Sequence, residues 1–218
     1  MKITWKHDHT AFPWPWTIDN KIEIFYERTF GWQLHIADLV ANGGKDGDGH
    51  DTIKIPHSGF AVLHVCLSYF ESHAKYEDGF ASHGKSAFYF KNGVKTVFQQ
   101  LNQWPTTAVN PFLNTLYEAA RCGLYHGSMT LPGIVLTSSI GSTVAFDPTH
   151  NRIALNPHRL PVDLKGHLGE YVARLRDVSQ TLLRQKFDKR FNFDNGITGA
   201  VGQALPVLAA SEESGSIG

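Results

Sequence analysis

The chain has 218 residues, a length that suits one domain or one domain with an insertion. Its hydrophobic content of 42% with 18% charged residues is typical of a globular protein with a buried core and excludes a largely disordered chain. Lysine plus arginine total 20, as do aspartate plus glutamate, so the chain has no overall basic field, and a nucleic-acid partner would need a local patch.

The first sixteen residues form a tryptophan-rich arm that two prolines interrupt, and we expect its tryptophans to pack on the body. Apolar residues then recur at helical spacing in four segments, of which the fourth opens with Asn110 as a cap and Pro111 in its first turn. Three short β-rich runs and a long last helix follow. The predicted helices cover residues 17–42, 56–79, 85–101, 111–126 and 162–191, and the β-rich runs cover 133–139, 142–147 and 152–157.

These segments predict a mainly α fold, a helical bundle of about five helices with a small antiparallel β insert before the last helix. The expected organisation is an arm over residues 1–16, a helical domain over 17–195 with its insert at about 133–157, and a tail over 196–218. Cys66 lies in an apolar helical run and Cys122 is the only other cysteine, so we expect no disulfide and a cytoplasmic protein. No run of 18 apolar residues predicts a membrane span.

The fourth predicted helix ends in "RCGLYHG", which places His126 five residues after Arg121. On an ideal helix these two residues lie about 140° apart, so they share a face only where the helix ends or distorts. Gly123 lies between them and would permit that distortion. Their spacing alone carries little weight, because Arg28 precedes His35, and Arg152 precedes His158, at similar separations. An ordinary surface arginine and a helix-terminal histidine remain an alternative interpretation.

The motif and its helical context resemble the HEPN superfamily (higher eukaryotes and prokaryotes nucleotide-binding domains). That superfamily carries an arginine, four to six residues and a histidine near the end of a helical bundle, which here corresponds to Arg121, "CGLY" and His126. The resemblance covers residues 17–195 and implies a metal-independent endoribonuclease without cofactors, acting on RNA as a homodimer. It also implies a setting in defence or stress response, with an antitoxin or regulatory protein as a possible partner.

In the reaction that this resemblance implies, Arg121 binds the scissile phosphate and His126 transfers a proton. Attack by the ribose 2′-hydroxyl would give a 2′,3′-cyclic phosphate and a 5′-hydroxyl, which restricts the substrate to RNA. Glu71 and Lys75, four residues apart, are candidates for substrate binding, although such pairs usually stabilise a solvated helix face. Glu118 and Tyr125 flank the motif and could line the site, and Tyr125 would equally suit the core.

Two other functions stay open. One is a non-catalytic helical module that binds a nucleotide or a protein partner through the same site. The other is a metal-dependent hydrolase that uses some of the 12 histidines. "KHDHT" and "KDGDGHD" are rich in histidine and aspartate, but neither shows a full set of metal ligands, and solvated loops explain both. We therefore predict no metal site.

Overall fold

The computed structural model describes residues 2–197, so most of the expected tail lies outside the described part of the chain. Within it the fold is mainly α, as predicted. The helices are α1 (Ile18–Thr29), α2 (His35–Asn42), α3 (Gly59–Asp78), α4 (Ser86–Val97), α5 (Thr106–Thr115), α6 (Gly123–Gly127), α7 (Leu160–Arg176) and α8 (Thr181–Asp194). The strands are β1 (Gly44–Lys45), β2 (Asp51–Thr52), β3 (Ile134–Leu136), β4 (Val144–Asp147) and β5 (Arg152–Leu155).

The first helical segment is continuous from α1 to α2 through a π-helical stretch, Phe30–Leu34. It begins with a capping box, because the Thr17 side chain accepts from the Asn20 amide and the Asn20 side chain accepts from the Thr17 amide. The N-terminal arm packs on this segment. The Trp5 ring covers Gly31 so closely that a Cβ there would lie 2.1 Å from its Cγ atom.

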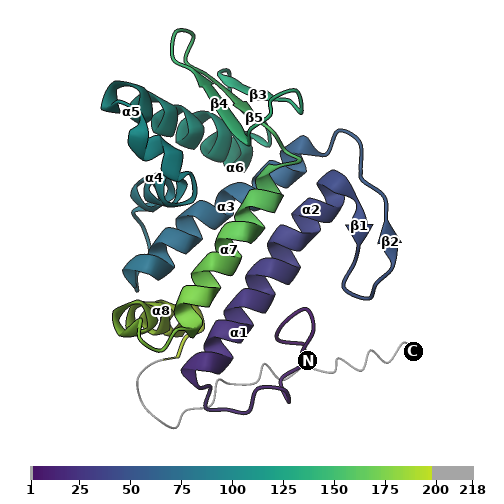
Figure 1. Cartoon of the computed structure of the whole chain (residues 1–218), viewed down its shortest axis with the longest axis vertical. Helices are drawn as coiled ribbons and strands as arrows, with labels where there is room; N and C mark the ends of the chain where they lie inside the picture. The colour runs from purple at the N-terminus through teal and green to yellow at the C-terminus, as the bar shows by residue number, and fades with distance from the viewer. Residues whose placement is uncertain (1, 198–218) are drawn as a thin grey trace, which may run out of the picture.

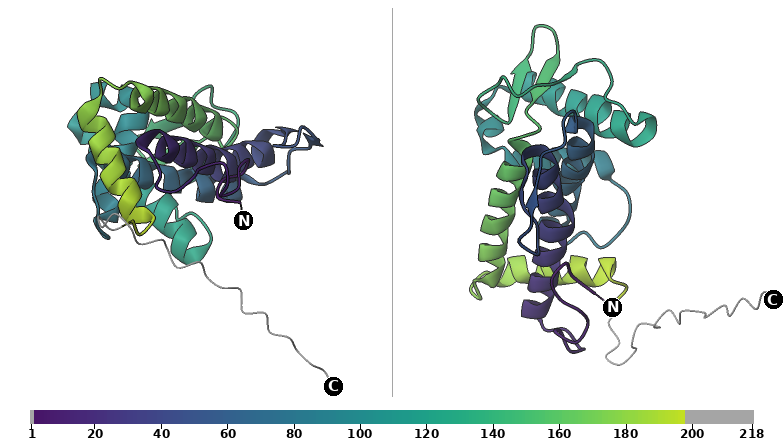
Figure 2. Two further views of the ribbon diagram at one scale, coloured as in Figure 1. Left: turned by 90° about the horizontal axis from the view of Figure 1, so that it is seen from below. Right: turned by 90° about the vertical axis from the view of Figure 1, so that its right-hand side faces the viewer.

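Helix α3 lies at the centre of the bundle and contacts α2, α4, α7 and α8. In Figure 1, α7 runs alongside the long segment of α1 and α2, and α8 crosses the end of the bundle that lies away from the three-stranded sheet. The right-hand view in Figure 2 shows α8 nearly perpendicular to α1 and α7. The core consists of apolar side chains from all these helices, including Phe70 and Phe90, which are both fully buried.

The predicted start of the fourth helix is wrong. Helix α5 begins at Thr106, directly after Pro105, and Pro111 lies inside it. The segment then continues through a second π-helical stretch, Leu116–Cys122, into α6. Pro105 fixes an extended backbone in front of the helix, and its carbonyl accepts from the amide of Ala108, so the helix starts one and a half turns earlier than expected.

The β insert is a mixed sheet, which corrects the prediction of an antiparallel one. Its strand order is β3-β5-β4, and only the β4–β5 pair is antiparallel. Strand β3 pairs with β5 in parallel, with Ile134 opposite Ile153. Leu136 at the end of β3 and Val144 at the start of β4 both lie opposite Leu155, so residues 137–143 cross one end of the sheet and leave the central position to β5.

The predicted last helix is two helices, α7 and α8, so the described residues contain six helical segments rather than about five. The break lies at Asp177, whose backbone is extended and whose side chain accepts from the Ser179 amide at 2.9 Å. This local hydrogen bond competes with helix continuation, as aspartate side chains commonly do in turns. No helix among residues 2–197 is long and apolar enough to cross a bilayer.

Candidate functional site

A pocket of about 250 Å³ lies where α3, the second π-helical stretch (Leu116–Cys122) and α8 meet. Its charged lining residues are Glu71 and Lys75 from α3, Arg121 from the π-helical stretch and Arg190 from α8. His64, Leu67, Ser68, Ser72, Leu124 and Tyr125 complete the lining. The pocket therefore brings together four of the residues singled out in the sequence, namely Glu71, Lys75, Arg121 and Tyr125.

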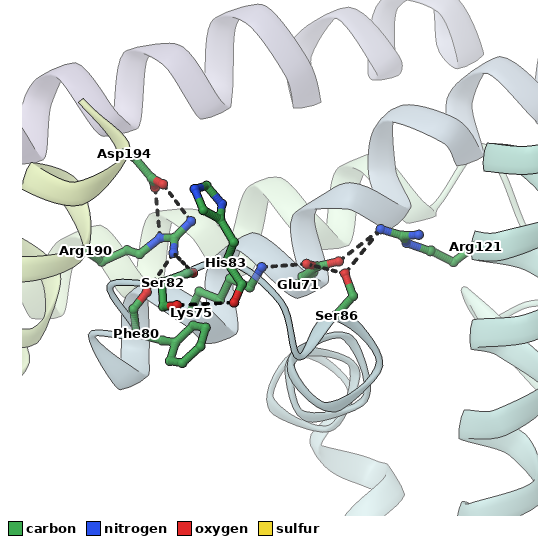
Figure 3. Close-up of polar contacts among 9 residues, drawn as sticks. All are labelled: Glu71, Lys75, Phe80, Ser82, His83, Ser86, Arg121, Arg190 and Asp194. Carbon is green, nitrogen blue, oxygen red and sulfur yellow. Dashed lines mark hydrogen bonds and ion pairs between the residues drawn. The ribbon is translucent and has the colours of Figure 1, made fainter. Parts of the chain in front are cut away.

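Glu71 is the centre of the polar network in this pocket (Figure 3). Its Oε1 atom accepts from Lys75 Nζ at 2.6 Å and from Ser86 Oγ at 2.5 Å, and its Oε2 atom accepts from Arg121 Nη2 at 3.2 Å. Burial raises the pKa of Glu71, but the hydrogen bonds from Lys75 and Ser86 together with the positive charges of Lys75 and Arg121 outweigh burial, so the pKa lies below its usual value. Glu71 is therefore ionised at neutral pH and fixes two cations in place.

Arg121 retains donors that can bind a ligand. Among the described residues, its hydrogen bonds to Glu71 and Ser86 both use Nη2, at 3.2 and 3.4 Å, which leaves Nε and Nη1 without a protein acceptor. The guanidinium lies 4.6 Å from the centre of the Tyr125 ring and 5.8 Å from that of Tyr117, so cation–π contacts hold its plane. Nε and Nη1 lie on different edges of the planar guanidinium, so each can donate separately to an oxygen of a carboxylate or a phosphate.

Arg190, by contrast, is committed to structural contacts. Its guanidinium pairs with Asp194 at 2.6 Å and donates to the carbonyls of Phe80 and Ser82 at 2.6 and 3.3 Å (Figure 3). These bonds tie α8 to the loop between α3 and α4. Arg190 thus forms a wall of the pocket, while Lys75 and Arg121 supply the positive charge nearest to Glu71.

The π-helical stretch Leu116–Cys122 explains how Arg121 reaches this pocket. A π turn carries an extra residue, which rotates the side chains that follow it relative to a regular α-helix, and such turns are frequent at functional sites. Gly123 does not create the bend that the sequence suggested, because its backbone is helical and its buried Cα faces the returning chain. A Cβ at Gly123 would lie 2.7 Å from the Met129 carbonyl oxygen.

His126 and Glu118 stand apart from the other candidates. Both side chains are exposed, and neither belongs to the lining of the pocket. The His126 ring lies 6.2 Å from the ring of Tyr125, its neighbour in the sequence. The structure therefore brings Arg121 of the motif into the pocket, whereas His126 lies outside the set of lining residues.

Sequence reasoning missed several residues of the site, among them His64, Ser86 and Arg190. His64 could have been found, because His64, Ser68, Glu71 and Lys75 recur at helical spacing and form a polar stripe along the helix. No local pattern marks Ser86 or Arg190, which reach the pocket from elements distant in the sequence. Among residues 2–197, no group of three or more histidine, cysteine, aspartate or glutamate side chains could hold a metal ion.

Comparison of the chain with protein-family models, with curated proteins and with solved structures gave no match. The geometry of the pocket is therefore the basis on which its function is inferred.

Proposed function

We propose that the pocket binds an RNA phosphodiester and that the chain is a metal-independent endoribonuclease of the HEPN type. The observation that carries this proposal is that Nε and Nη1 of Arg121 have no acceptor among the described residues, while Arg121 is held beside Lys75 in a pocket formed by separate helices. A phosphate oxygen can accept from one of these nitrogens, and Lys75 adds a second positive charge nearby.

In this proposal Arg121 offsets the charge that develops on the phosphate oxygens as the 2′-oxygen attacks. His126, the neighbour of Tyr125, transfers a proton, and imidazoles suit this task because they ordinarily titrate near neutral pH. The exposed ring of Tyr125 offers an apolar surface for contact with an unpaired base of the RNA. Residues of both copies of a homodimer could face one RNA strand, in a cytosolic defence or stress response controlled by an antitoxin or another regulator.

The test is cleavage of a single-stranded RNA oligonucleotide by purified protein in EDTA. The wild-type protein should give products with a 2′,3′-cyclic phosphate and a 5′-hydroxyl, without any metal. Arg121→Ala should lower the rate by about 100-fold or more, the usual effect of losing one group that stabilises a transition-state charge. His126→Ala should lower it by a similar factor.

Arg152→Ala is the matched control, because Arg152 is exposed on strand β5 and lies outside the pocket. This variant should cleave like the wild type, and circular dichroism should show that all variants are folded. Absence of cleavage by the wild-type protein, or cleavage at full rate by Arg121→Ala, would contradict the proposed activity.

The second candidate function is a non-catalytic module that binds a nucleotide or another phosphate-bearing partner. It is favoured by the position of His126 outside the pocket lining, which leaves the Arg121 pocket complete as an anion-binding site without it. This alternative predicts that an RNA or nucleotide binds the wild-type protein, that Arg121→Ala weakens binding, and that no strand is cleaved.

A further inference from the structure

His64 is the only histidine among the residues that line the described pocket. It lies on α3, and its ring stacks on that of Tyr125, with the ring centres 5.5 Å apart and the planes within 10°. The side chain is exposed to solvent, so its polar edge is accessible to a bound ligand.

Tyr125 connects His64 to the phosphate-binding arginine. The Arg121 guanidinium lies 4.6 Å from the centre of the same tyrosine ring on which His64 stacks. The ring of His126 also borders Tyr125, at 6.2 Å. Two imidazoles and one guanidinium are therefore grouped around one aromatic side chain, with His64 from α3 and the other two groups from the segment that runs from α5 to α6.

Cleavage of RNA by its own 2′-hydroxyl requires two proton transfers. A base removes the proton from the 2′-oxygen, which forms a bond to phosphorus. The bond from phosphorus to the 5′-oxygen then breaks, and the departing 5′-oxygen takes a proton from an acid. The two oxygens lie on opposite sides of the phosphorus atom, so one imidazole can serve both only by moving between them.

We propose that His64 is a second proton-transfer residue of this pocket and acts together with His126. The proposal rests on the ribonuclease function proposed above and adds to it a residue outside the arginine–histidine motif. A phosphodiester on the free donors of Arg121 would lie beside the pocket wall that His64 forms. Glu71, Lys75, Arg121 and Arg190 are the charged groups that line the same pocket, and Tyr125 covers one face of the imidazole.

Two substitutions separate proton transfer from packing. His64→Phe keeps an aromatic ring that can stack on Tyr125 but cannot carry a proton, and His64→Asn removes both properties. His150→Asn is the matched control, because His150 is exposed in the turn between β4 and β5 and lies outside the pocket. The measurements are cleavage of a single-stranded RNA in EDTA across the pH range 5 to 9, and binding of a 2′-deoxy oligonucleotide of the same sequence.

Both His64 variants should cleave RNA about 100-fold or more slowly than the wild type, the usual effect of losing a general acid or base. The pH–rate profile of each variant should lose one of the two limbs that the wild type shows. His64→Phe should bind the 2′-deoxy oligonucleotide as the wild type does, because the phosphate-binding groups are unchanged. The control variant should match the wild type in every measurement.

Cleavage at the wild-type rate by His64→Phe, with both limbs of the profile intact, would overturn the role of His64. If Arg121→Ala and His126→Ala are then inactive, the ribonuclease function stands without His64. If the wild-type protein binds RNA but cleaves none, the ribonuclease function fails, and the role of His64 fails with it.

Discussion

His167 on α7 is a partly buried histidine whose environment opposes its protonation. Its Nδ1 atom lies 2.9 Å from the hydroxyl of Tyr69, and its ring centre lies 4.4 Å from that of His73 on α3. Burial, and then the neighbouring His73, lower the pKa of His167 to about 4, although the carboxylate of Glu77 acts in the opposite direction. The folded protein therefore holds this imidazole in its neutral form throughout the range in which an exposed histidine titrates.

This lowered pKa predicts that the protein loses stability as the pH falls from about 6.5 towards 4. In that window the unfolded chain binds a proton at His167 and the folded chain does not, so protonation favours unfolding. Between pH 7.5 and pH 5 the contribution of this residue amounts to about 1 kcal/mol, because solvent screens a partly exposed imidazole and reduces the full effect of the shift. Urea denaturation at the two pH values measures it as the change in the free energy of unfolding.

His167→Gln should reduce this pH dependence, because glutamine can still form hydrogen bonds but does not titrate. His150→Gln is the control, since His150 is exposed, with 69% of its side chain accessible, and its loss should leave the dependence almost unchanged. An equal loss of stability between pH 7.5 and pH 5 in wild type and His167→Gln would show that another group is responsible.

The close approach of α3 and α4 depends on one glycine. A Cβ at Gly93 of α4 would lie 1.9 Å from the backbone carbonyl oxygen of Phe70 on α3. Because the obstacle is backbone, no side-chain rotation can relieve the overlap, and the two helices would have to move apart. Helix α3 carries Glu71 directly after Phe70, so this contact also sets the position of the pocket relative to Ser86 at the start of α4.

Gly93→Ala should therefore destabilise the protein by about 2–3 kcal/mol, the usual range for overpacking a rigid contact. Gly166→Ala is the matched control within α7, because a Cβ at Gly166 meets no atom within 4 Å. That substitution should stabilise the protein by about 0.5–1 kcal/mol through helix propensity. The midpoints of urea denaturation compare the two, and a Gly93→Ala protein as stable as the wild type would contradict the tight crossing.

The sequence predicts an element well where local apolar spacing specifies it, and poorly where a single hydrogen bond or a contact between distant residues does. Apolar spacing reveals α3 because nearly every turn of that helix contributes to the core. The break after α7 depends on one hydrogen bond from the Ser179 amide to Asp177, which apolar spacing cannot show. The parallel pairing of β3 with β5 depends on how residues 137–143 cross, and no local pattern specifies that path.

The candidate site was predictable only in part, for the same reason. The motif led to Arg121, and the spacing of Glu71 and Lys75 indicated a helix-face pair. Ser86 and Arg190 join them only in the folded chain. Ser86 lies 15 residues after Glu71 in the sequence, and Arg190 comes from a different helix, α8. His126 was selected by its distance in sequence from Arg121, whereas the π-helical stretch changes which side chains face the pocket.

The N-terminal arm connects distant parts of the molecule through Trp5. A Cβ at Gly31 or Gly47 would lie within 2.5 Å of the Trp5 ring, so this ring joins the first helical segment to the loop between β1 and β2. It also contacts the rings of Phe30 and His35, with centres 5.8 and 5.4 Å away. Trp14 in the same arm is 45% exposed and makes fewer such contacts.

Trp5→Ala should lower the free energy of unfolding by about 2–3 kcal/mol, because it leaves a gap between the two elements that this side chain joins. Limited proteolysis should then cut the loop at residues 46–50 sooner than in the wild type. Trp14→Ala, the same change at an exposed position, should cost less than about 1 kcal/mol and leave the loop protected. Equal effects of the two substitutions would show that the arm does not anchor the loop through Trp5.

The turn after Asp177 has a consequence for the order in which a newly made chain acquires its site. A straight continuation of α7 would carry Arg190 about 20 Å away from the end of α7, given the rise of an α-helix. Because the chain instead folds back, Arg190 closes the pocket from α8, the last helix that the structure describes. A ribosome-bound chain that has emerged only as far as Arg176 therefore has an incomplete pocket, and the site is complete only after α8 has emerged as well.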